Sequence, residues 1–191
     1  TADEKRYSGC RYRPRQTNDL TARSGHIIGD FIKAARGRGL NVYFQLSATA
    51  PPGLRDEDIP RLPDGRIPVD RMAATASLAS EDVRDYVTAY VDDLLQHYPD
   101  ITGFRPDWPE YPCYKLDELF QDFSPHVEAW CATRDIAFQP IRAEVTAFYD
   151  YIHGSLTNED LEELVAIAPG KVVEAEVLRR FPLIVQWLHM K

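Results

Sequence analysis

The sequence has few cysteines, no long apolar run and no surplus of basic residues. Its cysteines, Cys10, Cys113 and Cys131, are odd in number and widely spaced, which indicates neither a zinc site nor a disulfide framework. No window approaches the roughly 18 consecutive apolar residues of a membrane span, and no basic and apolar leader opens the chain. We therefore expect a cytoplasmic protein with buried thiols and no membrane partner.

Basic residues are in the minority. The chain carries 22 Lys and Arg residues against 30 Asp and Glu residues, a formal net charge of −8. Nucleic-acid binding needs a clustered basic face, so we expect no nucleic-acid partner. The one local concentration of positive charge is near the start, at Arg6, Arg11, Arg13 and Arg15. We interpret it as a solvated strand edge or an N-terminal arm.

Several catalytic and cofactor motifs are missing as well. The five histidines show neither HExxH nor cluster spacing, so we expect no metal site. The sequence contains neither of the glycine-rich phosphate-binding patterns nor the Gly-x-Ser-x-Gly turn of serine hydrolases. We therefore expect no cofactor and no serine-hydrolase chemistry.

The first half of the chain reads as alternating helices and strands. An apolar helical stripe over 27–35 ends at glycines and leads directly into the apolar strand Leu40–Ser47. Ser80 caps a strongly amphipathic helix with its stripe over 83–98, and a strand follows from Ile101. This order is typical of α/β folds with parallel strands.

Alternation along the strand at 40–47 places Val42, Phe44 and Leu46 toward covering helices, and Tyr43, Gln45 and Ser47 on the opposite face. Residues 48–79 then form a long, proline-rich loop. Because parallel sheets carry their sites beyond the carboxyl ends of their strands, we interpret this loop as functional.

The last third of the chain reads as helical. Ser124-Pro125 is a helix start, an apolar stripe covers 141–152, and Thr157 begins a further helix. Only Ile136–Phe138 reads as a weak strand in this region. We predict two regions, 1–135 with the site and 136–191 as a helical region packed on the same domain.

The stretch from Ile101 to Tyr114 has the composition of a small-molecule site, and sugars suit it best. Gly103, Arg105 and Asp107 share one side of the strand, and we expect Arg105 to pair with Asp107 and favour its ionised form. Large aromatic side chains follow at Trp108, Tyr111 and Tyr114; they combine flat apolar rings with polar tips.

The residues Asp82-Val-Arg-Asp-Tyr86, Tyr98–Gly103, Asp107 and Tyr111-Pro112 resemble a glycoside-hydrolase-like (β/α)8-barrel family. There, a Pro-Glu-Val-Arg-x-Tyr helix leads to a Tyr-Asp-Val-Asp-Gly-Ile-x-x-Asp strand. Gly103–Asp107 is also similar to the Gly-x-Arg-x-Asp strand of amylase-type barrels, whose aspartate is the nucleophile. The resemblance implies an α/β fold of the TIM-barrel type. Since a barrel has eight strands in about 250 residues, we expect a partial barrel or a segment of one.

The chemistry that this resemblance implies is hydrolysis of O-glycosyl bonds in an oligosaccharide or polysaccharide. Asp107 would be the nucleophile or stabiliser and Glu110 the acid/base. The expected substrate-binding side chains are Arg105, Trp108, Tyr111, Tyr114, Gln45 and Tyr43. The alternative is a non-catalytic carbohydrate-binding or structural module. An oligomer is compatible with an incomplete barrel.

Overall fold

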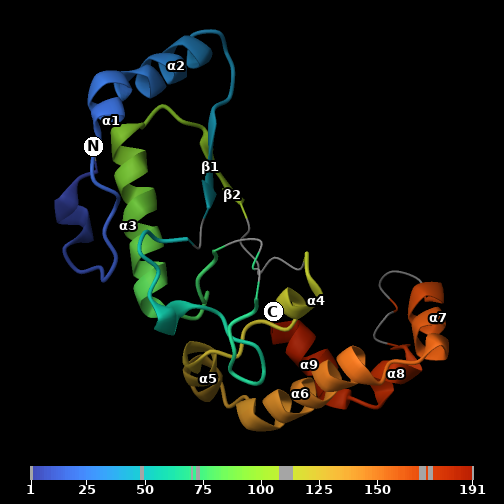
Figure 1. Cartoon of the computed structure of the whole chain (residues 1–191). Helices are drawn as coiled ribbons and strands as arrows, with labels where there is room; N and C mark the ends of the chain where they lie inside the picture. The colour runs from blue at the N-terminus through green and yellow to red at the C-terminus, as the bar shows by residue number, and fades with distance from the viewer. Residues whose placement is uncertain are drawn as a thin grey trace. The chain divides into compact units, whose positions relative to one another are not determined.

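A computed structural model describes residues 2–47, 50–69, 71, 74–107, 114–167, 171 and 174–190. These residues form two compact units (Figure 1). We call Thr1–Ile59 with Ala73–Pro109 the sheet unit, and Pro60–Met72 with Glu110–Lys191 the helical unit. The predicted functional division into 1–135 and 136–191 stays a prediction.

The sheet unit alternates short helices with two strands. In chain order its elements are the 3-10 helix η1 (Glu4–Tyr7), α1 (Asp19–Ser24), α2 (His26–Arg36), β1 (Tyr43–Ser47), the 3-10 helix η2 (Asp56–Asp58), α3 (Glu81–His97) and β2 (Gly103–Asp107). The two strands and the helices α2 and α3 lie where the sequence predicts them. Residues 9–14, which follow η1, form turns and irregular structure and no strand.

The centre of the sheet unit is the sequence β1, α3, β2 (Figure 1). The strands pair in parallel with Tyr43 opposite Gly103 and Ser47 opposite Asp107, which confirms the predicted parallel arrangement. The predicted cap at Ser80 is also confirmed, because its side chain accepts a hydrogen bond from the Val83 N–H.

The barrel prediction is wrong. In the described part of the chain the only sheet has two strands, and most of the residues there are helical. A (β/α)8 barrel has eight strands in one continuous ladder, and this two-stranded sheet among helices fits neither the predicted partial barrel nor a barrel segment. The local β1–α3–β2 order was predicted correctly, but it does not extend to further strands.

The two ends of the predicted loop that belong to the sheet unit, up to Ile59 and from Ala73, are held there by one buried carboxylate. Asp58 is fully buried and accepts hydrogen bonds from the Tyr12 hydroxyl, from Arg55 Nε at 2.8 Å and from Ser80 Oγ at 2.6 Å. Arg55 also pairs with Asp82. The network ties the N-terminal segment, the loop and the start of α3 together.

The helical unit contains α4 (Leu116–Leu119), α5 (Pro125–Ala132), α6 (Phe138–Gly154), α7 (Asn158–Ala166), α8 (Glu176–Arg179) and α9 (Pro182–Met190). Its core is built from Phe120, Ile141, Val145 and Trp187, each almost fully buried. The predicted helix starts at Pro125 and Thr157 are confirmed. The strand at Ile136–Phe138 is wrong, because Phe138 begins α6 and turns its ring into the core.

Two further expectations concern thiols and membranes. Cys10 and Cys131 are free thiols, and Cys131 is buried; Cys113 lies outside the described residues. Among the described helices, none has the length and hydrophobicity of a bilayer-spanning segment.

Candidate ligand-binding site

One face of the β1–β2 pair carries four of the predicted site residues: Tyr43, Gln45, Arg105 and Asp107. Register partners in a pleated sheet present their side chains on the same face, so Gln45 lies beside Arg105, and Ser47 beside Asp107. Tyr43 is 56% exposed, and its ring atoms Cδ1 and Cε1 lie 3.7 Å from the position that a Cβ on Gly103 would occupy. The tyrosine ring therefore lies against the glycine at the start of this face.

The expected Arg105–Asp107 pair does not form. Both side chains belong to the described residues, and no ion pair or hydrogen bond joins them. Residues two apart on a strand are separated by about 6.6 Å along the chain, and the Arg105 side chain is exposed to solvent. The Asp107 carboxylate consequently has no cation beside it on its own strand.

The remaining predicted residues are not brought to this face. Trp108, Glu110 and Tyr111 lie outside the described residues. Tyr114 belongs to the helical unit, where it is 66% exposed. The roles assigned to Asp107 and Glu110 therefore stay predictions.

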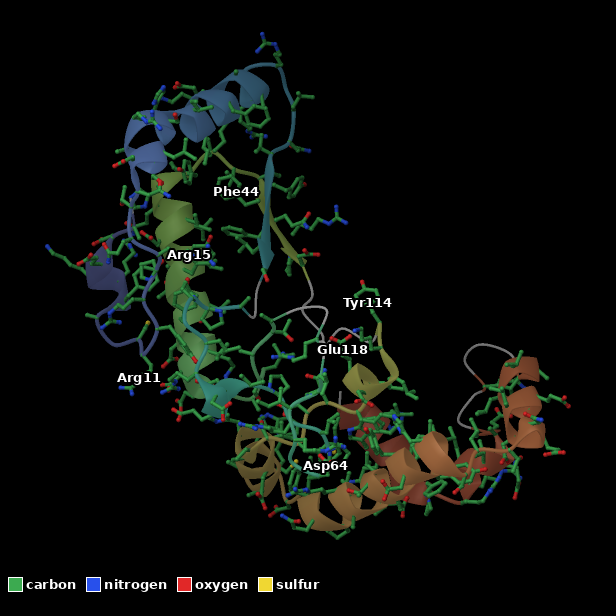
Figure 2. The ribbon with its side chains drawn as sticks, in the orientation of Figure 1. Arg11, Arg15, Phe44, Asp64, Tyr114 and Glu118 are labelled. Carbon is green, nitrogen blue, oxygen red and sulfur yellow. The ribbon has the colours of Figure 1, made fainter. Side chains whose placement is uncertain are left out.

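A cavity of about 430 Å³ lies within the sheet unit, between the N-terminal segment, the end of β1 and α3. Its polar and aromatic lining includes Arg15, Gln45, Ser47, Tyr86, Tyr90 and His97. Gln45 is the predicted site residue that reaches it. Figure 2 shows Arg15 beside α3, on the segment that connects η1 to α1.

Two tyrosines on α3 form one wall of the cavity. Tyr86 and Tyr90 are one helical turn apart, and their rings are nearly parallel, with an interplanar angle of 6° and centroids 5.9 Å apart. Burial raises the pKa of Tyr86 to about 12, Tyr90 adds to the rise, and Arg15 opposes it. Burial also raises the pKa of Tyr90, assisted by Asp93. Both hydroxyls therefore stay protonated at neutral pH and can donate hydrogen bonds.

One turn further along α3, a buried carboxylate orients a histidine. Asp93 is 4% exposed and accepts hydrogen bonds from the Asp3 backbone N–H at 3.1 Å and the Tyr7 hydroxyl at 3.2 Å. His97 Nδ1 lies 2.9 Å from the Asp93 backbone oxygen and 3.1 Å from its carboxylate. Both neighbours are acceptors, which assigns the proton to Nδ1 and leaves Nε2 of the neutral ring as an acceptor.

Much of the cavity's hydrogen-bonding capacity is unused by the protein. Among the described residues, the side chains of Arg15, Gln45 and Ser47 and the hydroxyls of Tyr86 and Tyr90 have no hydrogen-bond or ion-pair partner. Arg15, Gln45 and Ser47 are exposed, Tyr90 is half-buried and Tyr86 is buried, so a bound molecule could reach the exposed groups and replace their water with hydrogen bonds of its own. This combination of free polar groups and aromatic rings makes the cavity a candidate ligand-binding site.

Sequence reasoning missed most of this lining. Tyr86 and Tyr90 were assigned to the apolar stripe of their helix, His97 to scattered histidines and Arg15 to a solvated arm. The available signal was the i, i+4 spacing of Tyr86 with Tyr90 and of Asp93 with His97, which places each pair on one side of α3.

Comparison of the chain with protein-family models, with curated proteins and with solved structures gives no match. The resemblance to glycoside-hydrolase-like barrels therefore stays a prediction. The function has to be argued from the cavity itself.

Proposed function

We propose that this protein binds a carbohydrate in the cavity of the sheet unit. The observation that supports the proposal is that unpartnered polar side chains and two parallel tyrosine rings line the same space of about 430 Å³. This volume lies within the range of about 300–1,000 Å³ that small-molecule pockets occupy.

The chemistry of the lining suits sugars for a specific reason. A sugar hydroxyl both donates and accepts hydrogen bonds, and the Gln45 amide and the hydroxyls of Ser47, Tyr86 and Tyr90 can do the same. The C–H faces of a sugar ring are apolar and pack against aromatic side chains, which Tyr86 and Tyr90 provide. A purely apolar ligand would leave the polar groups unsatisfied at a cost of about 1–3 kcal/mol each.

Hydrolysis of O-glycosyl bonds is the second candidate function. Ser47 lines the cavity, and its register partner is Asp107, whose carboxylate is not paired with Arg105. A carboxylate next to the cavity supports the predicted role of Asp107 as nucleophile or stabiliser, with Glu110 as the acid/base. Carbohydrate binding is the more economical proposal because it requires only residues that line the cavity.

Titration calorimetry with a panel of neutral and acidic oligosaccharides tests the binding proposal. Gln45→Ala and Tyr90→Phe each remove one hydrogen-bonding group, so each should weaken binding by roughly fivefold. The matched control is Gln96→Ala, which alters an exposed glutamine on α3 that does not line the cavity. Binding that is unchanged in Gln45→Ala and Tyr90→Phe, or no binding of any oligosaccharide by the parent, would contradict the proposal.

Chromogenic glycosides test the second candidate. If Asp107 and Glu110 form the carboxylate pair, Asp107→Asn and Glu110→Gln should each reduce the hydrolysis rate at least a hundredfold. Equal hydrolysis by the parent and both variants would show that the catalytic assignment is wrong. Oligosaccharide binding without any hydrolysis would support the binding function and contradict the hydrolytic one.

A further inference from the structure

We propose that the cavity selects carbohydrates that carry a carboxylate group, of the uronic-acid class, and that the Arg15 guanidinium binds this carboxylate. The inference rests on the proposed carbohydrate-binding function and adds the charge of the ligand. It follows from the way in which the sheet unit distributes its cations and carboxylates.

Arg15 is a cation without a counter-ion in the described part of the chain. Its side chain lines the cavity and forms no ion pair or hydrogen bond with any described residue. Its guanidinium lies close enough to the Tyr86 hydroxyl to lower the pKa of that group against the effect of burial. Arg15 is exposed to solvent, so its charge is accessible to a ligand at the cavity lining.

Arg55 in the same unit shows the contrast. Its guanidinium pairs with Glu57 at 2.8 Å, with Asp58 at 2.6 Å and with Asp82. In a chain with 30 acidic and 22 basic side chains, an arginine has many possible partners, and Arg55 has three. The absence of any such partner for Arg15 leaves its charge available to a ligand.

The acidic residue in the cavity lining does not neutralise Arg15. Asp93 is 4% exposed, and its two carboxylate oxygens accept hydrogen bonds from the Asp3 N–H, the Tyr7 hydroxyl and His97 Nδ1. The Asp3 N–H and the Tyr7 hydroxyl are neutral donors, so they occupy the carboxylate oxygens without cancelling the charge, and Asp93 forms no ion pair with Arg15. The unused groups of the lining then comprise one cation and several neutral hydrogen-bonding groups, which favours an anionic and hydroxylated ligand.

A carboxylate matches this environment in geometry as well as charge. The guanidinium fork forms two parallel hydrogen bonds with a planar carboxylate, and such charge-assisted bonds are stronger than neutral ones. The neighbouring Tyr86 and Tyr90 hydroxyls remain protonated and can donate further hydrogen bonds to the ligand. A free inorganic anion shares the charge but would leave the tyrosine rings and the Gln45 amide without contacts.

The test compares matched ligands by titration calorimetry at low ionic strength. The probes are a galacturonic-acid trisaccharide, its neutral galactose counterpart and inorganic phosphate. The parent protein should bind the acidic trisaccharide about tenfold or more tightly than the neutral one. Arg15→Gln should reduce this preference to less than about threefold, because the acidic trisaccharide loses more affinity than the neutral one.

Arg11→Gln is the matched control. Arg11 belongs to the same N-terminal segment and is exposed, but it does not line the cavity, and Figure 2 shows it at a separate position from Arg15. This variant should keep the full preference for the acidic sugar. A similar loss in both variants would overturn the assignment to Arg15 and indicate a general effect of net charge.

The outcomes for the two proposals are distinguishable. Equal affinity of the parent for both trisaccharides overturns the acidic-sugar inference and leaves carbohydrate binding in place. If neither trisaccharide binds, the proposed function fails and the inference fails with it. If phosphate binds as tightly as the acidic sugar, the anion site stands but its assignment to a carbohydrate is wrong.

Discussion

Replacing Asp58 with asparagine tests the network that supports the cavity-bearing unit. The Asp58 side chain is fully buried and accepts from Tyr12, Arg55 and Ser80, and the last of these is also the N-cap of α3. An asparagine of the same shape removes the charge and turns an NH₂ group toward these donors. Because loss of one partner from a buried, hydrogen-bonded ion pair typically costs about 3–5 kcal/mol, we expect Asp58→Asn to destabilise the sheet unit by about 3 kcal/mol.

Hydrogen exchange of the α3 amides, followed by mass spectrometry, measures this change within the sheet unit. The matched control is Asp82→Asn, which removes another carboxylate from Arg55. The Asp82 side chain is 43% exposed, so its loss should cost less than about 1 kcal/mol. A loss below about 1 kcal/mol for Asp58→Asn, or equal losses in both variants, would refute the assigned role of Asp58.

The same network predicts a pH dependence with a definite sign. Burial by itself would raise the pKa of Asp58, but the hydrogen bonds from Ser80, Tyr12 and Arg55 outweigh it and lower the pKa below its ordinary value. The contribution of Asp58 to stability is therefore complete above about pH 3.9 and disappears as the pH falls through the lower folded-state pKa. The stability difference between the parent and Asp58→Asn should be constant near neutrality and shrink only below about pH 4.

Three further predictions concern the helical unit. Ile141→Ala should lower the free energy of unfolding of this unit by about 2–5 kcal/mol, whereas Val165→Ala, at a 77% exposed position, should change it by less than about 0.5 kcal/mol in urea titrations. The pKa of Asp160 is lowered to about 2, mainly by the hydrogen bond from Tyr151 and next by the one from Thr157. In Tyr151→Phe, carboxyl NMR should show a higher pKa for Asp160. An unchanged pKa would contradict the Tyr151–Asp160 contact. Burial raises the pKa of the Cys131 thiol, so at about pH 7.5 iodoacetamide should modify Cys131 only when the helical unit unfolds. Peptide mass spectrometry measures the modification, and rapid labelling of the native protein would refute this expectation.

The secondary structure that the sequence predicted correctly depends on local signals. The strand at Tyr43–Ser47 and the helix that begins after Ser80 follow from alternation, capping and a helical stripe within a few residues. The barrel prediction depended instead on short motifs in about a quarter of the chain and on strands that the sequence did not itself indicate. Parallel pairing of two strands is common to many folds, so it could not establish the number of strands.

The candidate cavity could not be predicted from the sequence for a related reason. Periodicity places Tyr86 and Tyr90 on the inner side of α3 but does not distinguish a ring that fills a core from one that lines a cavity. Asp93 stands apart from the apolar stripe, yet it is buried because Asp3 and Tyr7 from the distant N-terminal segment satisfy its carboxylate. Such long-range pairings leave no local signature in the sequence.

An NMR titration of ¹³C-labelled tyrosine rings and glutamine amides with the tightest-binding oligosaccharide tests most directly whether the cavity binds carbohydrate. Carbohydrate binding in the cavity predicts shifts in the Tyr86, Tyr90 and Gln45 signals that saturate together, at the affinity measured by calorimetry. The exposed ring of Tyr114 in the helical unit should not shift. Saturating shifts at Tyr114 with unchanged Tyr86 and Tyr90 signals would contradict the proposed site.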